Sequence, residues 1–128
     1  LLMIAEAENE VNHGPNDLAY ECINAVRERA GINKLAANLD ETGFRKAIKD
    51  ERAMELCFEY TRRFDLIRWG DYHKLMQEQV DKAQADESWK FGTNVYTYFN
   101  IPKSYNYFPI PANEIGSNSA IKTNNPGW

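Results

Sequence analysis

The sequence predicts a mainly α fold, in which helices fill the first half of the chain and long irregular coil fills the second. Up to about residue 70, apolar residues recur every three or four positions, which is the spacing of one face of an α-helix. Beyond that point, Gly, Pro and Asn interrupt the apolar runs, and aromatic residues become frequent. With 128 residues, 43% of them hydrophobic, the chain is long enough for one modest domain with a core.

Two short helices are predicted in residues 1–32, separated by the stretch NHGPND. In that stretch, Gly14 can adopt the left-handed conformation that ends a helix. Asn16 or Asp17 can begin the next helix as its N-cap, and Gly31 ends it. Because the turn is short, the helices are expected to pack antiparallel as a helical hairpin. The hairpin resembles one tetratricopeptide-like unit, without a second copy at the period of about 34 residues.

One long helix is predicted over residues 40–70. Asp40 is a suitable N-cap, and the leucine before it can pack against Phe44 in the first turns of the helix. The helical pattern then continues until Gly70, which can end it. The pattern also allows a kink near Tyr60, where aromatic and β-branched residues cluster.

Residues 71–128 are predicted to form a variable loop and an extended tail. The first part of this region still permits a short, mostly polar helix. An irregular aromatic-rich segment follows, with a short hairpin over residues 95–99 as one option. The Pro- and Asn-rich tail allows one helical turn at residues 112–115. So long a stretch with little regular structure is usually functional or depends on a partner surface.

Charge and patterning argue against several classes of protein. The net charge of −4 disfavours nucleic acid or an anionic membrane surface as a partner, since both attract basic proteins. The sequence contains neither a run of about 20 apolar residues nor a secretory signal pattern. From Leu1 onward it reads as the interior of a helix, with no capping residue ahead. We therefore expect the chain to be a piece of a longer protein.

Two carboxylates, Glu51 and Glu55, fall in the middle of the apolar face of the long helix. Placed one turn apart, they could form the acid/base pair of a glycoside hydrolase. Alternatively, arginines could neutralise them in a structural network. A nearby cation lowers the pKa of a carboxyl group, whereas a general acid needs a raised pKa, so we predict the network and no catalytic residue. Its predicted members are Glu51, Glu55, Arg62, Arg63 and Arg68, with Arg27, Arg29 and Arg52 as further candidate partners.

Aromatic side chains between residues 89 and 108 supply the candidate ligand surface. Exposed aromatic rings stack on sugars and other ligands with an apolar face, although such rings can equally fix a long coil onto the helices. Neither His13 nor His73 has other ligands at metal-binding spacing, and no Gly-rich phosphate loop occurs, so no metal or other cofactor is predicted. The predicted ligand contacts are Trp89, Phe91, Tyr96 and Tyr98.

Three stretches together resemble the C-terminal part of SusD/RagB family proteins. They are "LLMIAEAENEVNHGP" with "AYECINAVRERAG", then "ERAMELCFEYTRRFDLIRWG", and the ending "PIPANEI…NPGW". The resemblance covers nearly the whole chain in the right order, except the segment from Met76 to Phe108, where members differ. Ser119 and Trp128 stand where the family often has proline and tyrosine.

This resemblance implies a mainly helical fold built on tetratricopeptide-like hairpins, in an outer-membrane lipoprotein that faces the exterior of Bacteroidetes-type bacteria. Such polysaccharide-utilisation proteins bind oligosaccharides or other nutrients and cover a TonB-dependent SusC-like transporter, without catalysis. The implied partners are that transporter and a nutrient, with a lipid anchor outside these residues. The residues alone leave an alternative open, a helical protein–protein interaction module without a small-molecule ligand. No ligand-contact motif carries over to this chain.

Overall fold

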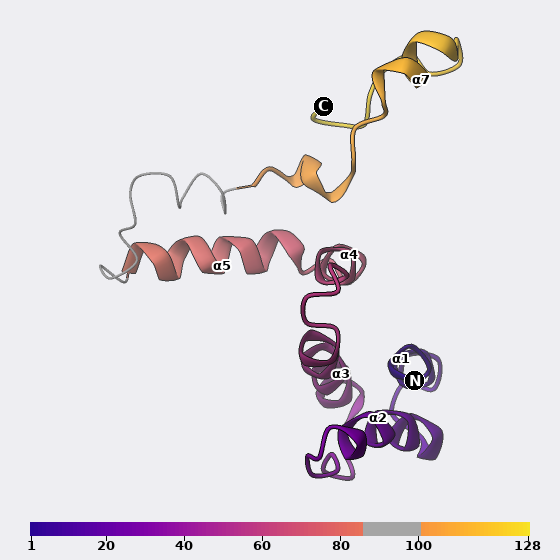
Figure 1. Ribbon diagram of the computed structural model, residues 1–128, viewed down its shortest axis with the longest axis vertical. Helices are drawn as coiled ribbons and strands as arrows, with labels where there is room; N and C mark the ends of the chain where they lie inside the picture. The colour runs from indigo at the N-terminus through magenta and orange to yellow at the C-terminus, as the bar shows by residue number, and fades with distance from the viewer. Residues whose placement is uncertain (86–100) are drawn as a thin grey trace. The chain divides into compact units, whose positions relative to one another are not determined.

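The computed structural model describes residues 1–85 and 101–128, and the chain divides into two compact units, residues 1–62 and 63–128. Within the described residues every regular element is a helix, so the predicted mainly α class is confirmed (Figure 1). The aromatic-rich segment, with the hairpin suggested over residues 95–99, lies outside the described residues.

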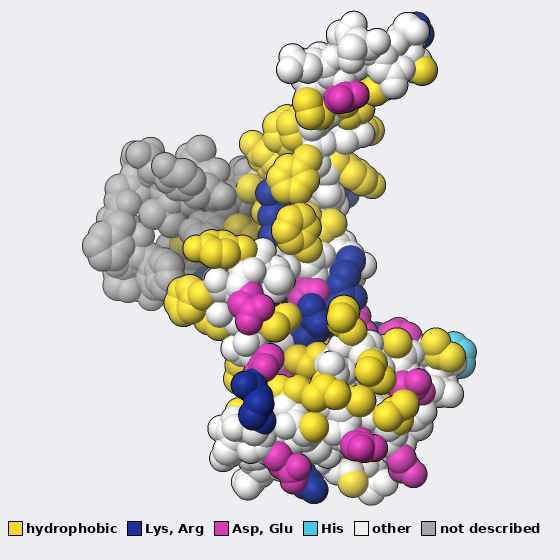
Figure 2. Space-filling model, turned by 45° about the vertical axis from the view of Figure 1, so that its right-hand side comes forward, with side chains coloured by type: hydrophobic (Ala, Val, Ile, Leu, Met, Phe, Trp, Pro, Cys, Tyr) yellow, Lys and Arg dark blue, Asp and Glu magenta, His cyan; other side chains and the backbone are white. Residues whose placement is uncertain are grey.

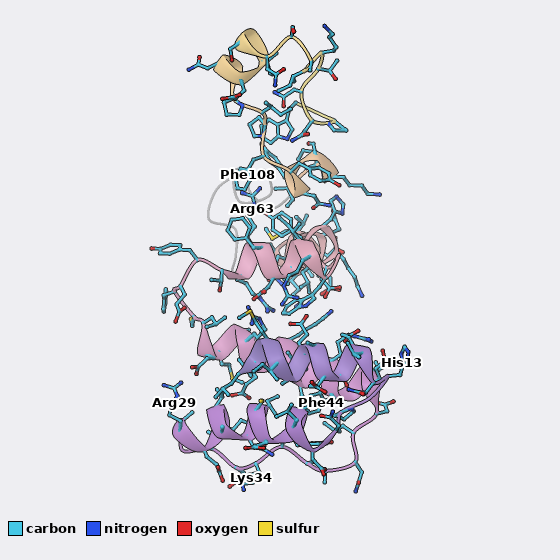
Figure 3. All side chains as sticks on the ribbon, turned by 90° about the vertical axis from the view of Figure 1, so that its right-hand side faces the viewer. His13, Arg29, Lys34, Phe44, Arg63 and Phe108 are labelled. Carbon is cyan, nitrogen blue, oxygen red and sulfur yellow. The ribbon has the colours of Figure 1, made fainter. Side chains whose placement is uncertain are left out.

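Unit 1 is a three-helix assembly in which α1 and α2 form the predicted hairpin and α3 packs against both. These helices are α1 (Leu2–Val11), α2 (Asp17–Arg29) and α3 (Glu41–Glu55). Phe44 fills the centre, with its ring edge-to-face against Tyr20 at 4.9 Å between centroids (Figure 3). Ile23 and Ile48 are also fully buried. The buried core cluster consists of Leu2, Ala5, Ala19, Cys22, Ile23, Val26, Phe44 and Ile48.

The helix ends of unit 1 follow the predicted capping residues with one exception. The side chain of Asn16 accepts the backbone N–H of Ala19 at 2.9 Å, and Asp40 caps α3 in the same way. Gly31 adopts a φ of 73° just past α2, as predicted. At the end of α1, however, His13 rather than Gly14 takes the left-handed conformation, with a φ of 53°. In this conformation the backbone N–H of Gly14 donates to the carbonyl of Asn9 at 3.0 Å.

The prediction of a single long helix over residues 40–70 is wrong in one respect, because the structure has two helices there with a break between them. α3 ends at Glu55, and α4 (Arg62–Arg68) begins after a non-helical connection. In that connection Phe58 and Tyr60 have φ values of 66° and 59°, which cannot belong to a right-handed helix. The apolar periodicity runs on across this break, which is why the pattern alone predicted at most a kink there.

Replacing Tyr60 with glycine is expected to raise the free energy of unfolding by up to about 1 kcal/mol, because glycine adopts a positive φ without a steric penalty. The ring of Tyr60 is 91% exposed, so little packing is lost with it. Urea denaturation followed by circular dichroism measures the change. Tyr60→Ala is the matched control, because it keeps the β-carbon and should bring no gain. A Tyr60→Gly chain less stable than wild type would mean that the exposed ring contributes to folding.

Unit 2 holds short helices that follow one another along the chain. They are α4, which starts at the last residue of unit 1, then α5 (Tyr72–Ala85), η2 (Lys103–Asn106) and α7 (Ala112–Ser117). Just past the end of α4, Gly70 has a φ of 76°, and the N–H of Asp71 bonds back to the carbonyl of Leu66 at 2.9 Å. The polar helix and the helical turn predicted in this half of the chain correspond to α5 and α7.

The end of the chain folds back onto residues 104–110. The side chain of Asn124 accepts the backbone N–H of Ile110 at 2.7 Å and donates to its carbonyl at 3.3 Å. Gly127 has a φ of 88°, and a β-carbon there would lie 2.4 Å from the β-carbon of Ser104, so only glycine fits. These contacts seat the indole of Trp128, which donates to the carbonyl of Ser104 at 3.2 Å. The residues after α7 are therefore held by side-chain hydrogen bonds and a close glycine contact.

Candidate functional site

The candidate site is a group of aromatic side chains in unit 2, gathered around one arginine and called here the Arg63 cluster. Its members are Arg63, Phe64, Tyr72, Tyr105 and Phe108. The guanidinium carbon of Arg63 lies 4.6 Å from the centre of the Phe108 ring and 5.6 Å from that of Tyr72 (Figure 3). The Arg63 Nη2 also donates to the backbone carbonyl of Tyr105 at 2.8 Å. One side chain from α4 thus joins the start of α5 to the segment after η2.

The charge of Arg63 suits this position because a guanidinium is attracted to the face of an aromatic ring and keeps its charge at any physiological pH. Its Nε atom is buried and has no hydrogen-bond partner within the described residues, so the rings and one carbonyl hold the group. A contact of this kind restricts the ring beneath it. Arg63 therefore joins these side chains into one platform.

Three rings of the Arg63 cluster are open to solvent. Phe64 is 55%, Phe108 56% and Tyr105 36% exposed, and the centroids of the two phenylalanine rings lie 6.2 Å apart. Tyr105 packs edge-to-face against Trp128 at 5.1 Å on the same segment. Because Arg63 covers part of Phe108 and about half of the ring remains exposed, the platform can present an aromatic face to a ligand.

Unit 1 carries an open groove of about 770 Å³ along α2, beside the connection to α3. Its lining combines apolar side chains with several polar ones, and two of the polar groups already hold the connection in place. The Asn24 carbonyl oxygen accepts the N–H of Leu35 at 2.8 Å, and the Tyr20 hydroxyl accepts the N–H of Leu39 at 2.9 Å. Lys34 pairs with Glu28 at 3.0 Å. These groups support the loop, so the groove is a weaker candidate than the Arg63 cluster.

Two further tests of the site concern metals and membranes. Within the described ranges 1–85 and 101–128, no three His, Cys, Asp or Glu side chains gather closely enough to hold a metal ion. Over the same residues, no helix combines the length and the apolar character needed to span a bilayer.

Comparison with known proteins identifies the family. A sequence model of the SusD family matches residues 1–128. The chain belongs to the SusD family. Among curated proteins it is 40% identical to SusD-like protein P25 of Formosa agariphila, over 94% of this chain and 21% of that protein. It is 30% identical to SusD-like protein P2 of the same organism, over 100% of this chain and 24% of that protein.

A solved structure agrees with this assignment. The crystal structure of a SusD homolog from Bacteroides thetaiotaomicron VPI-5482 superposes with a TM-score of 0.83 at 39% identity, covering 99% of this chain and 25% of that one. The chain thus spans about a quarter of the length of the SusD-family proteins that it matches. The predicted resemblance to SusD/RagB proteins is confirmed.

The predicted ligand contacts of this SusD-family chain, Trp89, Phe91, Tyr96 and Tyr98, lie outside the described residues. The Arg63 cluster was not predicted as a unit. Its tyrosines and phenylalanines are visible in the sequence as aromatic residues, but Arg63 was assigned to an ion-pair network. Arg63 and Tyr105 are 42 residues apart, and no periodicity links them. The contact follows from the fold of unit 2.

The two carboxylates of α3 each face an arginine from α2. Glu51 is 3% exposed, and its Oε2 lies 2.6 Å from Nη1 of Arg27. Glu55 is bonded to Arg29 at a more exposed position (Figure 3). Both arginines were candidate partners in the sequence. Each carboxylate thus forms an ion pair with an arginine of the neighbouring helix, which suits a structural role better than that of a general acid.

The three arginines predicted as the core of the network lie on α4. Arg62 donates to the carbonyl of Lys49 at 3.2 Å. Arg63 belongs to the aromatic cluster described above, and Arg68 bonds to Asp65 at 3.0 Å and lies over the ring of Trp69. A structural network that joins Glu51 and Glu55 to these three arginines stays a prediction.

A further ion-pair group ties α1 to α3. Arg45 bonds to Glu10 through Nε at 2.7 Å, and its Nη2 also bonds to Glu41. The hydrogen bond from Arg45 holds the pKa of Glu10 below its ordinary value of 4.5, and the same contacts raise the pKa of Arg45. The i,i+4 spacing of Glu41 and Arg45 on α3 could have indicated their pair, whereas nothing in the sequence linked Glu10 on α1 to them.

Stability should depend on the charge of Glu10. Because its pKa is lower in the folded state than in the unfolded chain, its stabilising effect is complete well above pH 4.5 and is lost as the pH falls through the lowered pKa. We expect Glu10→Gln to weaken the pH dependence of the melting temperature below about pH 5. Thermal melts from neutral pH into the acid range measure this, with Glu21→Gln, an exposed site on α2, as control. An unchanged pH profile would contradict a stabilising role for the pair.

Proposed function

We propose that this SusD-family chain belongs to a cell-surface protein that binds nutrients, with glycans as the leading class, and delivers them to a TonB-dependent SusC-like transporter in the outer membrane. The observation that carries the proposal is the family match over residues 1–128. Membrane attachment would come from a lipid anchor in another part of the polypeptide. The proposed role is binding without catalysis.

The geometry of both units supports binding rather than catalysis. The two carboxylates that could resemble a hydrolase pair, Glu51 and Glu55, each contact an arginine, which is the arrangement of a structural ion pair. Unit 2 offers partly exposed rings on a restrained platform, which is the chemistry that stacks on sugar rings. We propose that Trp89, Phe91, Tyr96 and Tyr98 also contact the ligand.

Titration with a panel of soluble oligosaccharides tests the proposal. We expect a change in tryptophan fluorescence with a dissociation constant between about 1 µM and about 1 mM for at least one glycan. Trp89→Phe should abolish most of that change if Trp89 contacts the sugar, whereas Trp69→Phe serves as the matched control. Silence across the panel would contradict the proposal and favour a protein–protein interaction module.

Product analysis with the same glycans tests the absence of catalysis. The proposal predicts that every glycan is recovered intact. Hydrolysis by wild type that disappears in Glu51→Gln would overturn the binding-only role and restore the acid/base interpretation of that residue.

A further inference from the structure

Two rings of the Arg63 cluster lie on one short segment of unit 2, residues 104–110. Tyr105 belongs to η2, and Phe108 follows in a stretch that forms neither helix nor strand. Backbone of this kind is held by the side chains that bond to it. Arg63 supplies one such bond, to the carbonyl of Tyr105 at 2.8 Å. The position of both rings relative to Arg63 therefore depends on what else holds the segment.

Residues 124–128 hold this segment at both of its ends. After α7 the chain turns back toward η2 (Figure 1), and the indole of Trp128 donates to the carbonyl of Ser104 at 3.2 Å. At the other end, Asn124 bonds to both the N–H and the carbonyl of Ile110. All three bonds go to backbone groups, so they fix the path of the segment itself.

Each of the two ring-bearing residues also has its own contact with residues 124–128. The side-chain amide of Asn125 donates to the carbonyl of Phe108 at 2.7 Å. The ring of Tyr105 packs edge-to-face against Trp128, with 5.1 Å between the centroids. Figure 2 shows hydrophobic side chains gathered on this part of unit 2, between α4 and α7. Both rings are thus held by two separate parts of the sequence, α4 and residues 124–128.

The contact between the two segments leaves no room for a side chain at residue 127. A β-carbon on Gly127 would lie 2.4 Å from the β-carbon of Ser104 and 2.9 Å from its Oγ. Atoms cannot approach so closely, so a larger residue would displace one segment from the other. The absence of a side chain at Gly127 therefore sets how near the two segments come. Tyr105 is the next residue after Ser104, so its ring would move with such a displacement.

We propose that residues 124–128 are a positioning element of the binding surface, which sets where the rings of Tyr105 and Phe108 lie relative to Arg63. The use of these rings for a glycan rests on the function proposed above, whereas their arrangement can be measured without a ligand. An aromatic platform stacks on a sugar only when its rings lie at a fitting distance and angle, so supporting residues determine affinity without contacting the ligand.

Proton–nitrogen NMR spectra of this chain test the positioning in the absence of any ligand. The Nε–H group of Arg63 is buried, which slows exchange of its proton with water, and the guanidinium lies over the Phe108 ring, whose ring current shifts the signal. We expect Gly127→Ala to move this signal and the indole N–H signal of Trp128 toward the positions of solvent-exposed side chains. Arg63→Lys and Trp128→Phe assign the two signals, because each removes one of them.

A second substitution separates displacement of the segment from a general loss of structure. Ser104→Gly removes the β-carbon that the new methyl group meets and keeps the carbonyl that binds Trp128. Adding it to Gly127→Ala should therefore recover most of both signals. Gly116→Ala adds a methyl group in α7, where no atom lies within 4 Å, and should leave both signals as in wild type. Circular dichroism checks that all variants keep the same helix content.

Affinity is measured with the glycan of the panel above that wild type binds most tightly. Gly127→Ala should raise its dissociation constant at least about tenfold, and the added Ser104→Gly should bring it back to within about threefold of wild type. A Gly127→Ala chain that keeps its Arg63 signal, or one that loses this signal and binds the glycan like wild type, would overturn the proposal. If wild type binds no glycan, the proposed function fails, and the two NMR signals still decide whether residues 124–128 position the rings.

Discussion

Replacing Phe44 with alanine is expected to lower the free energy of unfolding of unit 1 by about 3–5 kcal/mol. The ring is completely buried, packs edge-to-face on Tyr20, and lies between Ile23 and Ile48 in the centre of the three helices. Its removal loses the transfer free energy of a large apolar side chain and leaves a cavity that the surrounding helices can fill only in part. Urea denaturation followed by circular dichroism at 222 nm measures the loss.

Two matched substitutions decide whether the loss comes from the cavity. Phe44→Leu keeps most of the volume and should cost about half as much or less. Met54→Ala removes a large side chain from the same helix, but at a position that is 60% exposed, so it should change stability by less than about 1 kcal/mol. If Phe44→Ala costs no more than Met54→Ala, Phe44 does not hold the helices together as the structure indicates.

The parts of this fold that the sequence predicts well are those fixed by neighbouring residues. Asn16 and Asp40 cap their helices through bonds that span three positions, and Gly31 and Gly70 end theirs through local backbone conformation. Such signals need no knowledge of the rest of the chain. The family resemblance was equally readable, because long stretches of sequence carry it.

The parts that the sequence predicts poorly depend on competition between local preferences or on distant contacts. The helical pattern of residues 40–70 continues through Phe58 and Tyr60, yet both residues adopt a left-handed conformation there. The connection of Arg63 to Phe108 joins segments that no periodicity relates. Arg63 stands near acidic residues in the sequence, and an acidic partner was expected for it. In the structure its guanidinium lies over the rings of Tyr72 and Phe108. Composition alone does not distinguish these two environments.

Replacing Glu51 with leucine is expected to lower the free energy of unfolding by about 3–5 kcal/mol, because Arg27 is left as a poorly solvated charge without its partner. The Glu51 side chain is 4% exposed and that of Arg27 is 19% exposed, so water cannot readily replace the lost carboxylate. Glu55→Leu is the matched control. Its partner Arg29 is 67% exposed, and loss of such a pair should cost less than about 1 kcal/mol. The same denaturation experiment compares the two.

A double substitution separates the interaction between Arg27 and Glu51 from the effect of each charge on its own. Arg27→Met combined with Glu51→Leu should be far more stable than either single variant, because an apolar pair of similar volume leaves no buried charge unpaired. If the pair is structural, the double variant should also keep the glycan affinity of wild type. A stable double variant that no longer binds glycan would instead assign these residues to the ligand site. Additive losses in stability would show that Arg27 and Glu51 act independently and would contradict the paired geometry.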